Sequence, residues 1–208
     1  MKQALLILTC TALSLGAALA RADGDAAKGK VSFTVCEACH GKTAEGNKAL
    51  GAPRLAGQAG WYLARQLGNF KQGLRGVDTK DTFGTQMRPM AQTLADDAAV
   101  ANVVAYIGTL QSPTPAATVQ GDAAAGKAAY ATCAACHGAN GEGNQALNAP
   151  KLAGQHDWYI ARELQNFKAG LRGADAKDSF GAQMRPMAAT LADDAAINNV
   201  AAYIATLN

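Results

Sequence analysis

One segment of about ninety residues occurs twice in this chain, and the duplication constrains the fold more than any other feature. Residues 24–110 align without a gap with residues 121–207, at an offset of 97 residues. Roughly two thirds of the paired positions are identical. The offset is too long for a solenoid repeat, so it indicates two copies of one domain. We expect an N-terminal domain over 21–110, a linker with two prolines over 111–120 and a C-terminal domain over 121–208.

The first twenty residues have the pattern of a secretory signal peptide. One lysine precedes an apolar run, which ends in the small residues Ala18-Leu19-Ala20. This pattern predicts cleavage after Ala20, or after Ala22 at a second site of the same type. A membrane anchor is the alternative, but Thr, Ser and Gly dilute the apolar run. Export implies an oxidising compartment for the mature chain, and we expect Cys10 to be removed with the leader.

Apolar spacing predicts an all-α fold with three helices in each copy. In the first copy, we expect helices over 26–35, 61–74 and 95–110, and loops over 41–60 and 75–94. The second copy repeats the helices at 122–132, 158–171 and 192–207. Loops this long in a small domain count against independent folding unless another group occupies the centre.

The charge of the chain excludes one class of partner. The formal net charge is only +3, which does not favour binding to nucleic acid. The halves differ, however, because residues 21–111 carry +3 and residues 112–208 carry −1. We expect this asymmetry to separate the two halves in reduction potential and to orient the chain on a partner.

Two C-x-x-C-H motifs carry the chemistry of the chain. They are Cys36 to His40 and Cys133 to His137, and they match at the repeat offset. This motif is typical of covalent attachment of a c-type haem, so we predict two c-type haems with their iron. Two cysteines three residues apart project to one side of a helix end. Their thiols then reach the two vinyl groups of one porphyrin, and the adjacent histidine binds the iron.

Three other kinds of cysteine site remain alternatives. A C-x-x-C pair can form a redox disulfide. Two such pairs can hold zinc, but they are then usually ~15–20 residues apart, far closer than here. A structural disulfide would close a small and strained loop.

The methionines suggest the second axial ligand of each iron. After the initiator, every methionine lies in one of the twin MRPMA segments, as Met87, Met90, Met184 and Met187. A methionine used only to fill a core would be scattered along the chain. Met87 and Met184 each follow the motif histidine by 47 residues. We expect one methionine of each segment to be a ligand, Met87 or Met90 in the first and Met184 or Met187 in the second, since His/Met ligation is a known haem arrangement.

Other residues suit supporting roles around each haem. Pro53 and Pro150 follow the motif histidines by 13 residues, where a backbone carbonyl can accept the imidazole N–H. Trp61 and Trp158 open the middle helices and pack either at a haem edge or in the core. His156 has no equivalent in the first copy, and we expect it at the surface or at a helix start. The recurring cationic side chains are expected to meet haem propionates or, mostly, to lie on solvated faces: Arg54, Arg65, Arg75, Arg88, Lys151, Arg162, Arg172 and Arg185.

With these motifs, the whole mature chain resembles the di-haem cytochrome c4 family, a class I cytochrome c written twice. The shared features are the paired C-x-x-C-H, the PRLAGQ and PKLAGQ segments before W-Y, the M-x-P-M segments and the final AAYI helix. The resemblance implies two all-α domains, each wrapped around one haem and related by a pseudo-twofold axis. It implies axial ligation by His40 with Met87 and by His137 with Met184.

The resemblance also implies a function. It is that of a periplasmic one-electron carrier, soluble or peripherally attached to the membrane, between a respiratory donor complex and a terminal oxidase. With both axial positions filled, the chain needs no catalytic residue and no small-molecule substrate. The alternatives are a di-haem peroxidase, a dehydrogenase of sulfur compounds, and a cytochrome subunit docked permanently to a flavoprotein.

Overall fold

Eight helices in two sets of four build the structure, a computed structural model that describes residues 24–207. The first set comprises α1 (Ala26–His40), α2 (Gly60–Lys71), α3 (Thr82–Gln92) and α4 (Asp97–Thr109). The second comprises α5 (Ala123–His137), α6 (Asp157–Lys168), α7 (Ser179–Ala189) and α8 (Asp194–Ile204). The described part of the chain holds no strand, only two isolated bridges, Asn47 with Ala52 and Asn144 with Ala149. The expected signal peptide lies outside these residues.

The first helix of each domain runs further than the sequence indicated. The carboxylate of Asp25 accepts hydrogen bonds from the backbone N–H groups of Ala27 and Lys28, at 2.9 and 3.1 Å, and so caps α1. The helix continues through His40, and Gly41 ends it with a φ of 81°. In α5, Asp122 and Gly138 take the same two roles. The whole C-x-x-C-H motif therefore lies on helix, with the histidine as its last residue.

The expectation of a loop over 75–94 is wrong, because α3 occupies much of that segment. The carboxylate of Asp81 accepts a hydrogen bond from Gly84 N at 3.0 Å and starts the helix. A Cβ at position 84 would lie 2.0 Å from the Asp81 carboxylate, so the glycine makes this cap possible. Pro89 lies inside α3 and lowers its helix propensity, which obscured the helix in the sequence. The second domain repeats this arrangement in α7.

The first and last helices of each domain cross closely and form the core. A Cβ at Gly29 of α1 would lie 1.9 Å from the carbonyl oxygen of Asn102 in α4. The ring of Phe33 packs edge to face against Tyr106, with 5.4 Å between ring centroids. Gly126 and Tyr203 show the same close approach between α5 and α8. The small residue opposite a large one thus sets the crossing of the two helices.

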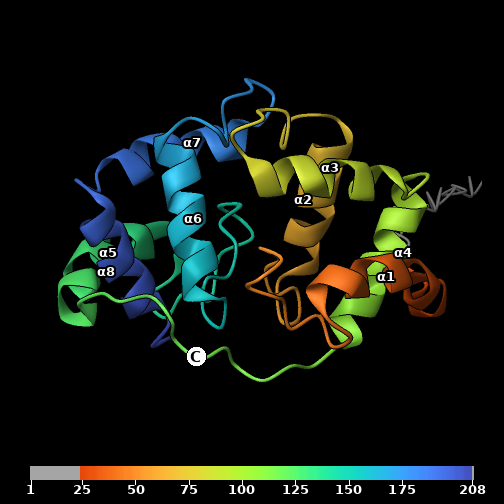
Figure 1. Ribbon diagram of the computed structural model, residues 1–208, viewed down its shortest axis with the longest axis horizontal. Helices are drawn as coiled ribbons and strands as arrows, with labels where there is room; N and C mark the ends of the chain where they lie inside the picture. The colour runs from red at the N-terminus through yellow and green to blue at the C-terminus, as the bar shows by residue number, and fades with distance from the viewer. Residues whose placement is uncertain (1–23, 208) are drawn as a thin grey trace, which may run out of the picture.

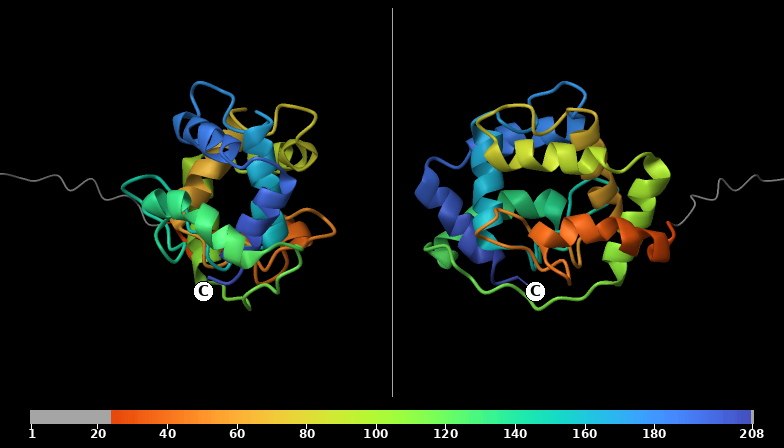
Figure 2. Two further views of the ribbon diagram at one scale, coloured as in Figure 1. Left: turned by 90° about the vertical axis from the view of Figure 1, so that its left-hand side faces the viewer. Right: turned by 45° about the vertical axis from the view of Figure 1, so that its right-hand side comes forward.

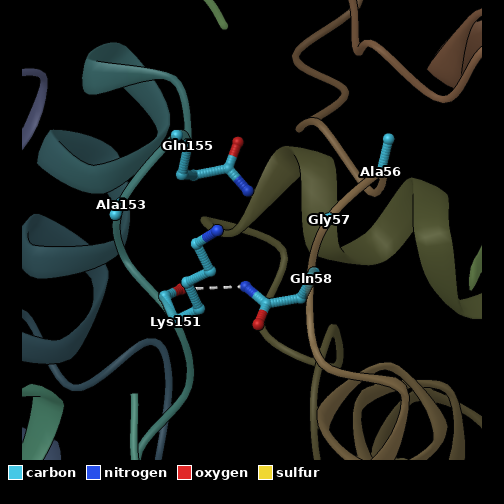
Figure 3. Close-up of a pocket in the computed structure, with 7 residues that line it drawn as sticks. Ala56, Gly57, Gln58, Lys151, Ala153 and Gln155 are labelled. Carbon is cyan, nitrogen blue, oxygen red and sulfur yellow. Dashed lines mark hydrogen bonds between the residues drawn. The ribbon is translucent and has the colours of Figure 1, made fainter. Parts of the chain in front are cut away.

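The two domains lie side by side, and the 111–120 segment runs along one edge between them (Figure 1). The further views in Figure 2 show the same pairing of domains. Their contacts come in equivalent pairs. Gln155 Nε2 donates to the Arg54 carbonyl oxygen at 2.9 Å, and Gln58 Nε2 donates to that of Lys151 at 2.9 Å (Figure 3). Such reciprocity is what a twofold axis produces, here with two homologous domains in place of identical subunits.

Within residues 24–207, no helix has both the length and the apolar character needed to cross a membrane.

Candidate functional site

Each motif histidine is buried and held by a backbone carbonyl. His40 is 5% exposed, and its Nδ1 lies 2.8 Å from the carbonyl oxygen of Pro53. His137 is 6% exposed and lies 2.8 Å from the carbonyl oxygen of Pro150. A carbonyl only accepts, so Nδ1 carries the proton and Nε2 keeps its lone pair. This is the orientation and tautomer that a histidine needs to bind a metal.

Burial also keeps both rings neutral. It lowers the pKa of His40 and of His137, and the hydrogen bond to the proline carbonyl opposes this shift only in part. A protonated imidazole has no lone pair for a metal, so the lowered pKa values favour the ligating form. The two domains share the same arrangement.

The first cysteine of each motif lacks the lowered pKa that a redox-active thiol needs. Cys36 and Cys133 are half-buried, whereas Cys39 and Cys136 are exposed. Burial raises the pKa of Cys36 and of Cys133, while a reactive cysteine needs a lowered one. Within residues 24–207, no three side chains of His, Cys, Asp or Glu gather closely enough to hold a metal ion. The raised pKa values of Cys36 and Cys133 disfavour a redox-active dithiol at either motif.

The methionines lie on α3 and α7, which run above the C-terminal ends of α1 and α5 (Figure 1). Met87 and Met184 are half-buried, Met90 is 38% exposed and Met187 is half-buried. The two methionines of each pair are three residues apart and so share one face of their helix. The segment is therefore a helix that presents two thioethers, and the choice between them stays a prediction.

A buried polar cluster that sequence patterns did not predict joins the two domains. Arg75 and Arg172 are each 6% exposed, and both bind the carboxylate of Glu163, Arg75 at 2.7 Å. Both also donate to the side-chain oxygen of Gln66, at 2.9 Å each. Burial alone would raise the pKa of Glu163, but the two guanidinium groups outweigh it and hold the pKa below its usual range. We name these four residues the interdomain cluster.

Most of the recurring cations belong to this interface, so the expectation of mostly solvated faces is wrong. Arg65 donates to the side-chain and backbone oxygens of Asn148, at 3.0 Å each. Arg162 makes the equivalent bond to the Gly51 carbonyl oxygen at 2.7 Å. Arg54 bonds Gly154 O at 2.7 Å. Arg185 is the one member of that set in the exposed class.

The aromatic residues of the middle helices also face the other domain. The hydroxyl groups of Tyr62 and Tyr159 accept hydrogen bonds from Arg172 and Arg75, at 2.8 and 3.3 Å. The guanidinium of Arg65 lies over the Trp61 ring at 5.0 Å, and that of Arg162 lies over Trp158 at 5.2 Å. The two tryptophans thus pack beside interface arginines.

His156 is a helix-start residue, as expected, but it is not at the free surface. It precedes α6, and its Nε2 lies 2.8 Å from the carbonyl oxygen of Glu45 in the other domain. The neighbouring Asp157 is 1% exposed and accepts hydrogen bonds from Thr118 and Val119 of the linker. These two residues replace Ala59 and Gly60 of the first copy, and that difference is the signal that could have revealed their role.

The residues present fit a haem in each domain. A C-x-x-C-H motif ends α1 and α5, and each histidine presents a neutral, oriented imidazole. Several buried Nε groups at the interface lack a hydrogen-bond partner: those of Arg65, Arg75, Arg162 and Arg172. An unpaired buried donor is costly, and haem propionates are anions that can satisfy such groups.

Comparisons with known proteins support a haem site in each domain. The family model for cytochrome c matches the chain twice, over residues 26–111 and 123–208. Cytochrome c4 of Azotobacter vinelandii is 36% identical, over 96% of this chain and 97% of the relative. A thiosulfate dehydrogenase electron acceptor of Stutzerimonas stutzeri is 33% identical, over 83% of this chain and 78% of the relative. The crystal structure of reduced cytochrome c4 from Pseudomonas stutzeri superimposes with a TM-score of 0.71 and 30% identity, covering 89% of this chain and all of that one.

Proposed function

This chain belongs to the cytochrome c4 family, and on that premise we propose that it carries electrons in the bacterial periplasm from a respiratory donor complex to a terminal oxidase. As a member of that family it is a di-haem electron carrier and not an enzyme, with two c-type haems. Each haem supplies a one-electron couple between Fe(III) and Fe(II).

The cysteines and histidines of the two motifs hold the haems in this proposal. The thiols of Cys36 and Cys39 would hold one haem through thioethers, and those of Cys133 and Cys136 would hold the other. His40 and His137 would bind the two irons through Nε2, while the carbonyl oxygens of Pro53 and Pro150 hold Nδ1. Met87 and Met184 would supply a thioether ligand to each iron. An iron with a histidine and a methionine ligand would have no place for substrate, and the thioether would raise its potential.

The observation that carries this function is the equivalence of the two sites. Both histidines are buried, neutral and 2.8 Å from a proline carbonyl. A peroxidase or dehydrogenase would need one haem with a weak or missing sixth ligand, and the two copies offer no such difference. Two haem sites that leave no free position on the iron for a substrate suit the storage and transfer of electrons.

Oxidation by membranes of the source bacterium tests the proposed route. The holoprotein is purified, reduced and mixed with membranes that contain a terminal oxidase, and the haem bands are followed. We expect rapid oxidation that requires O₂ and that cyanide inhibits. Oxidation that is equally fast with boiled membranes would refute the role of the oxidase. Recovery of the protein in the cytoplasmic fraction, with its leader intact, would refute the compartment.

A second candidate concerns the donor. One relative is named as the electron acceptor of a thiosulfate dehydrogenase. That name supports a sulfur-compound dehydrogenase as the donor here, in place of a respiratory complex. Reduction of the oxidised protein by thiosulfate with such an enzyme, but not by the quinol-driven membranes, would favour this donor. The opposite result would favour the respiratory complex.

A further inference from the structure

The aromatic residue in the middle of the first helix differs between the two copies by one hydroxyl group. Tyr130 of α5 is 2% exposed, and Phe33 of α1, at the equivalent position, is 1% exposed. Their rings pack in the same way. The Tyr130 ring lies 5.3 Å from that of Tyr203 in α8, and the Phe33 ring lies 5.4 Å from that of Tyr106 in α4. The hydroxyl is therefore the feature that distinguishes these two aromatic pairs.

The Tyr130 hydroxyl binds the residue that follows the motif histidine. It donates to the carbonyl oxygen of Gly138 at 2.8 Å. Gly138 ends α5 with a φ of 84°, directly after His137. Burial raises the pKa of Tyr130 to about 12, so the hydroxyl keeps its proton and remains a donor at neutral pH. Tyr130 thus ties the middle of α5 to the backbone that leaves His137.

Backbone hydrogen bonds extend this tie to the carbonyl that orients the imidazole. The Gly141 N–H donates to the same Gly138 oxygen at 3.2 Å. The Gly141 carbonyl oxygen in turn accepts from Leu152 N at 2.8 Å. Leu152 lies two residues after Pro150, whose carbonyl oxygen is 2.8 Å from His137 Nδ1. The Tyr130 hydroxyl therefore supports both chain segments that fix the His137 ring.

The first copy has the same backbone loop without this support. Ala44 N donates to the Gly41 carbonyl oxygen at 3.1 Å, but the Phe33 side chain has no donor for that oxygen. Ala44 also adopts a φ of 56°, in the left-handed region that disfavours a residue with a Cβ. Its equivalent in the second copy, Gly141, adopts a φ of 68° at less cost. Two differences thus favour the loop of the second domain.

The other contacts of the first loop do not replace the missing hydroxyl. Thr43 Oγ1 donates to the Glu45 carboxylate at 2.7 Å, but this bond is exposed and joins two residues of the same loop. His156 of the second domain reaches the loop only at the Glu45 carbonyl oxygen, five residues after His40. Among the described residues, no side chain donates to the carbonyl oxygen of Gly41. The bond from the first helix to the residue after the histidine is specific to the second domain.

We propose that Tyr130 is a positioning residue of the second haem site, where its hydroxyl holds the backbone beside His137 and so fixes the orientation of the iron-binding imidazole. Groups that orient a metal-binding histidine from outside the ligand set tune the metal that it binds. The first site has no equivalent of this hydrogen bond. This inference rests on the proposed function, because His137 must bind iron for its orientation to matter.

Hydrogen exchange of the holoprotein tests the support of the loop. The Gly143 N–H donates to the His137 carbonyl oxygen at 2.7 Å, so its exchange reports local opening beside the histidine. Tyr130→Phe removes the hydroxyl and keeps the ring. We expect exchange of the Gly143 amide to become about tenfold faster, as for the loss of one hydrogen bond. Exchange of the equivalent amide, that of Gly46, should change less than about twofold.

Two further variants complete the comparison. Tyr203→Phe is the matched control, because its ring packs against Tyr130 while its hydroxyl makes no hydrogen bond within residues 24–207. It should leave exchange of the Gly143 amide within about twofold of wild type. Phe33→Tyr with Ala44→Gly gives the first copy the residues of the second at both positions. It should slow exchange of the Gly46 amide by about threefold or more.

The ferric haem gives a readout that a merely structural role would not change. In a low-spin ferric haem, the hyperfine shifts of the haem methyl protons depend on the orientation of the axial imidazole. Each haem is assigned by nuclear Overhauser contacts to its own C-x-x-C-H motif. We expect Tyr130→Phe to change the methyl shifts of the second haem and to leave those of the first haem in place. A purely structural hydroxyl would lower the urea midpoint without changing these shifts.

The outcomes separate this inference from the proposed function. A wild-type protein without covalent haem would overturn both. Two haems with unchanged methyl shifts in Tyr130→Phe would overturn the positioning role and leave the proposed function intact, even if the urea midpoint falls. Unchanged exchange of the Gly143 amide in Tyr130→Phe, or an equal effect of Tyr203→Phe, would also overturn it.

Discussion

The carboxylate of Glu163 lies 2.7 Å from the guanidinium of Arg75, across the boundary between the two domains. The position equivalent to Glu163 in the first domain is Gln66, so the interdomain cluster holds one carboxylate for two buried arginines. The interface is nearly symmetric, but its negative charge comes from the second domain alone.

Replacement of that carboxylate should lower the stability of the folded protein. Glu163→Gln leaves two buried arginines without an anion among the protein side chains of the interdomain cluster. We expect the free energy of unfolding to fall by about 3 kcal/mol, as for other buried ion pairs that lose one partner. Urea unfolding followed by haem absorbance measures the change.

The symmetry of the interface supplies a matched control. Gln66→Glu combined with Glu163→Gln moves the carboxylate to the equivalent position, where the side-chain oxygen already accepts from both arginines. This double variant should recover most of the lost stability. An unchanged Glu163→Gln protein, or a double variant no better than the single one, would contradict this role of the carboxylate.

The same carboxylate predicts a dependence of stability on pH. Because its pKa is lowered in the folded protein, its contribution is complete above the pKa of the unfolded chain, about 4.3. The contribution is lost as the pH falls through the lower folded pKa. The difference in unfolding free energy between wild type and Glu163→Gln should therefore shrink below about pH 4. Urea unfolding across a pH series tests this, and a constant difference would oppose it.

Replacement of single methionines should distinguish the two thioethers of α3. Met87→Ala should abolish the sulfur-to-iron band of one ferric haem, halve the total band and lower the potential of that haem. Met90→Ala removes the same group three residues away and should leave the band intact. The reverse pattern would assign Met90 as the ligand. Met184→Ala and Met187→Ala make the same comparison in the second domain.

The close crossing of α1 and α4 predicts a specific effect of one added methyl group. Gly29→Ala places a Cβ 1.9 Å from the Asn102 carbonyl oxygen, so the two helices must separate. We expect a loss of about 1–3 kcal/mol in unfolding free energy. Gly108→Ala is the control, since that position in α4 has no neighbouring atom within 4 Å. The control should be neutral or slightly stabilising, by up to about 1 kcal/mol. Equal effects of the two variants would refute the packing argument.

The sequence predicted the all-α fold and two haems because both leave local patterns. Apolar residues at helical spacing predicted the helices near 61–74 and 95–110, and the two C-x-x-C-H motifs predicted the haems. Comparison with known relatives then confirmed the family. The helix over Thr82–Gln92 was missed because Pro89 and Gly84 have low helix propensity, while the Asp81 cap that starts it needs a contact invisible in the sequence.

The interface between the domains was harder to foresee. Arg75 and Arg172 look like surface cations in the sequence, and only the folded chain brings Glu163 to both of them. The linker contact of Asp157 likewise joins residues 38 or 39 positions apart. Polar contacts between residues far apart in the chain produce no periodic pattern in the sequence. The one sign of them there is a difference between equivalent positions of the two copies.

The number of covalent haems per chain, together with the ferric and ferrous optical spectra, tests the central claim most directly. Two closed electron-transfer sites predict two haems per chain, low-spin spectra for both and a sulfur-to-iron band from both ferric irons. One haem in the high-spin state, or without the sulfur band, would indicate an open axial position and contradict a pure electron carrier. A chain without haem, after expression with the attachment machinery, would contradict the account altogether.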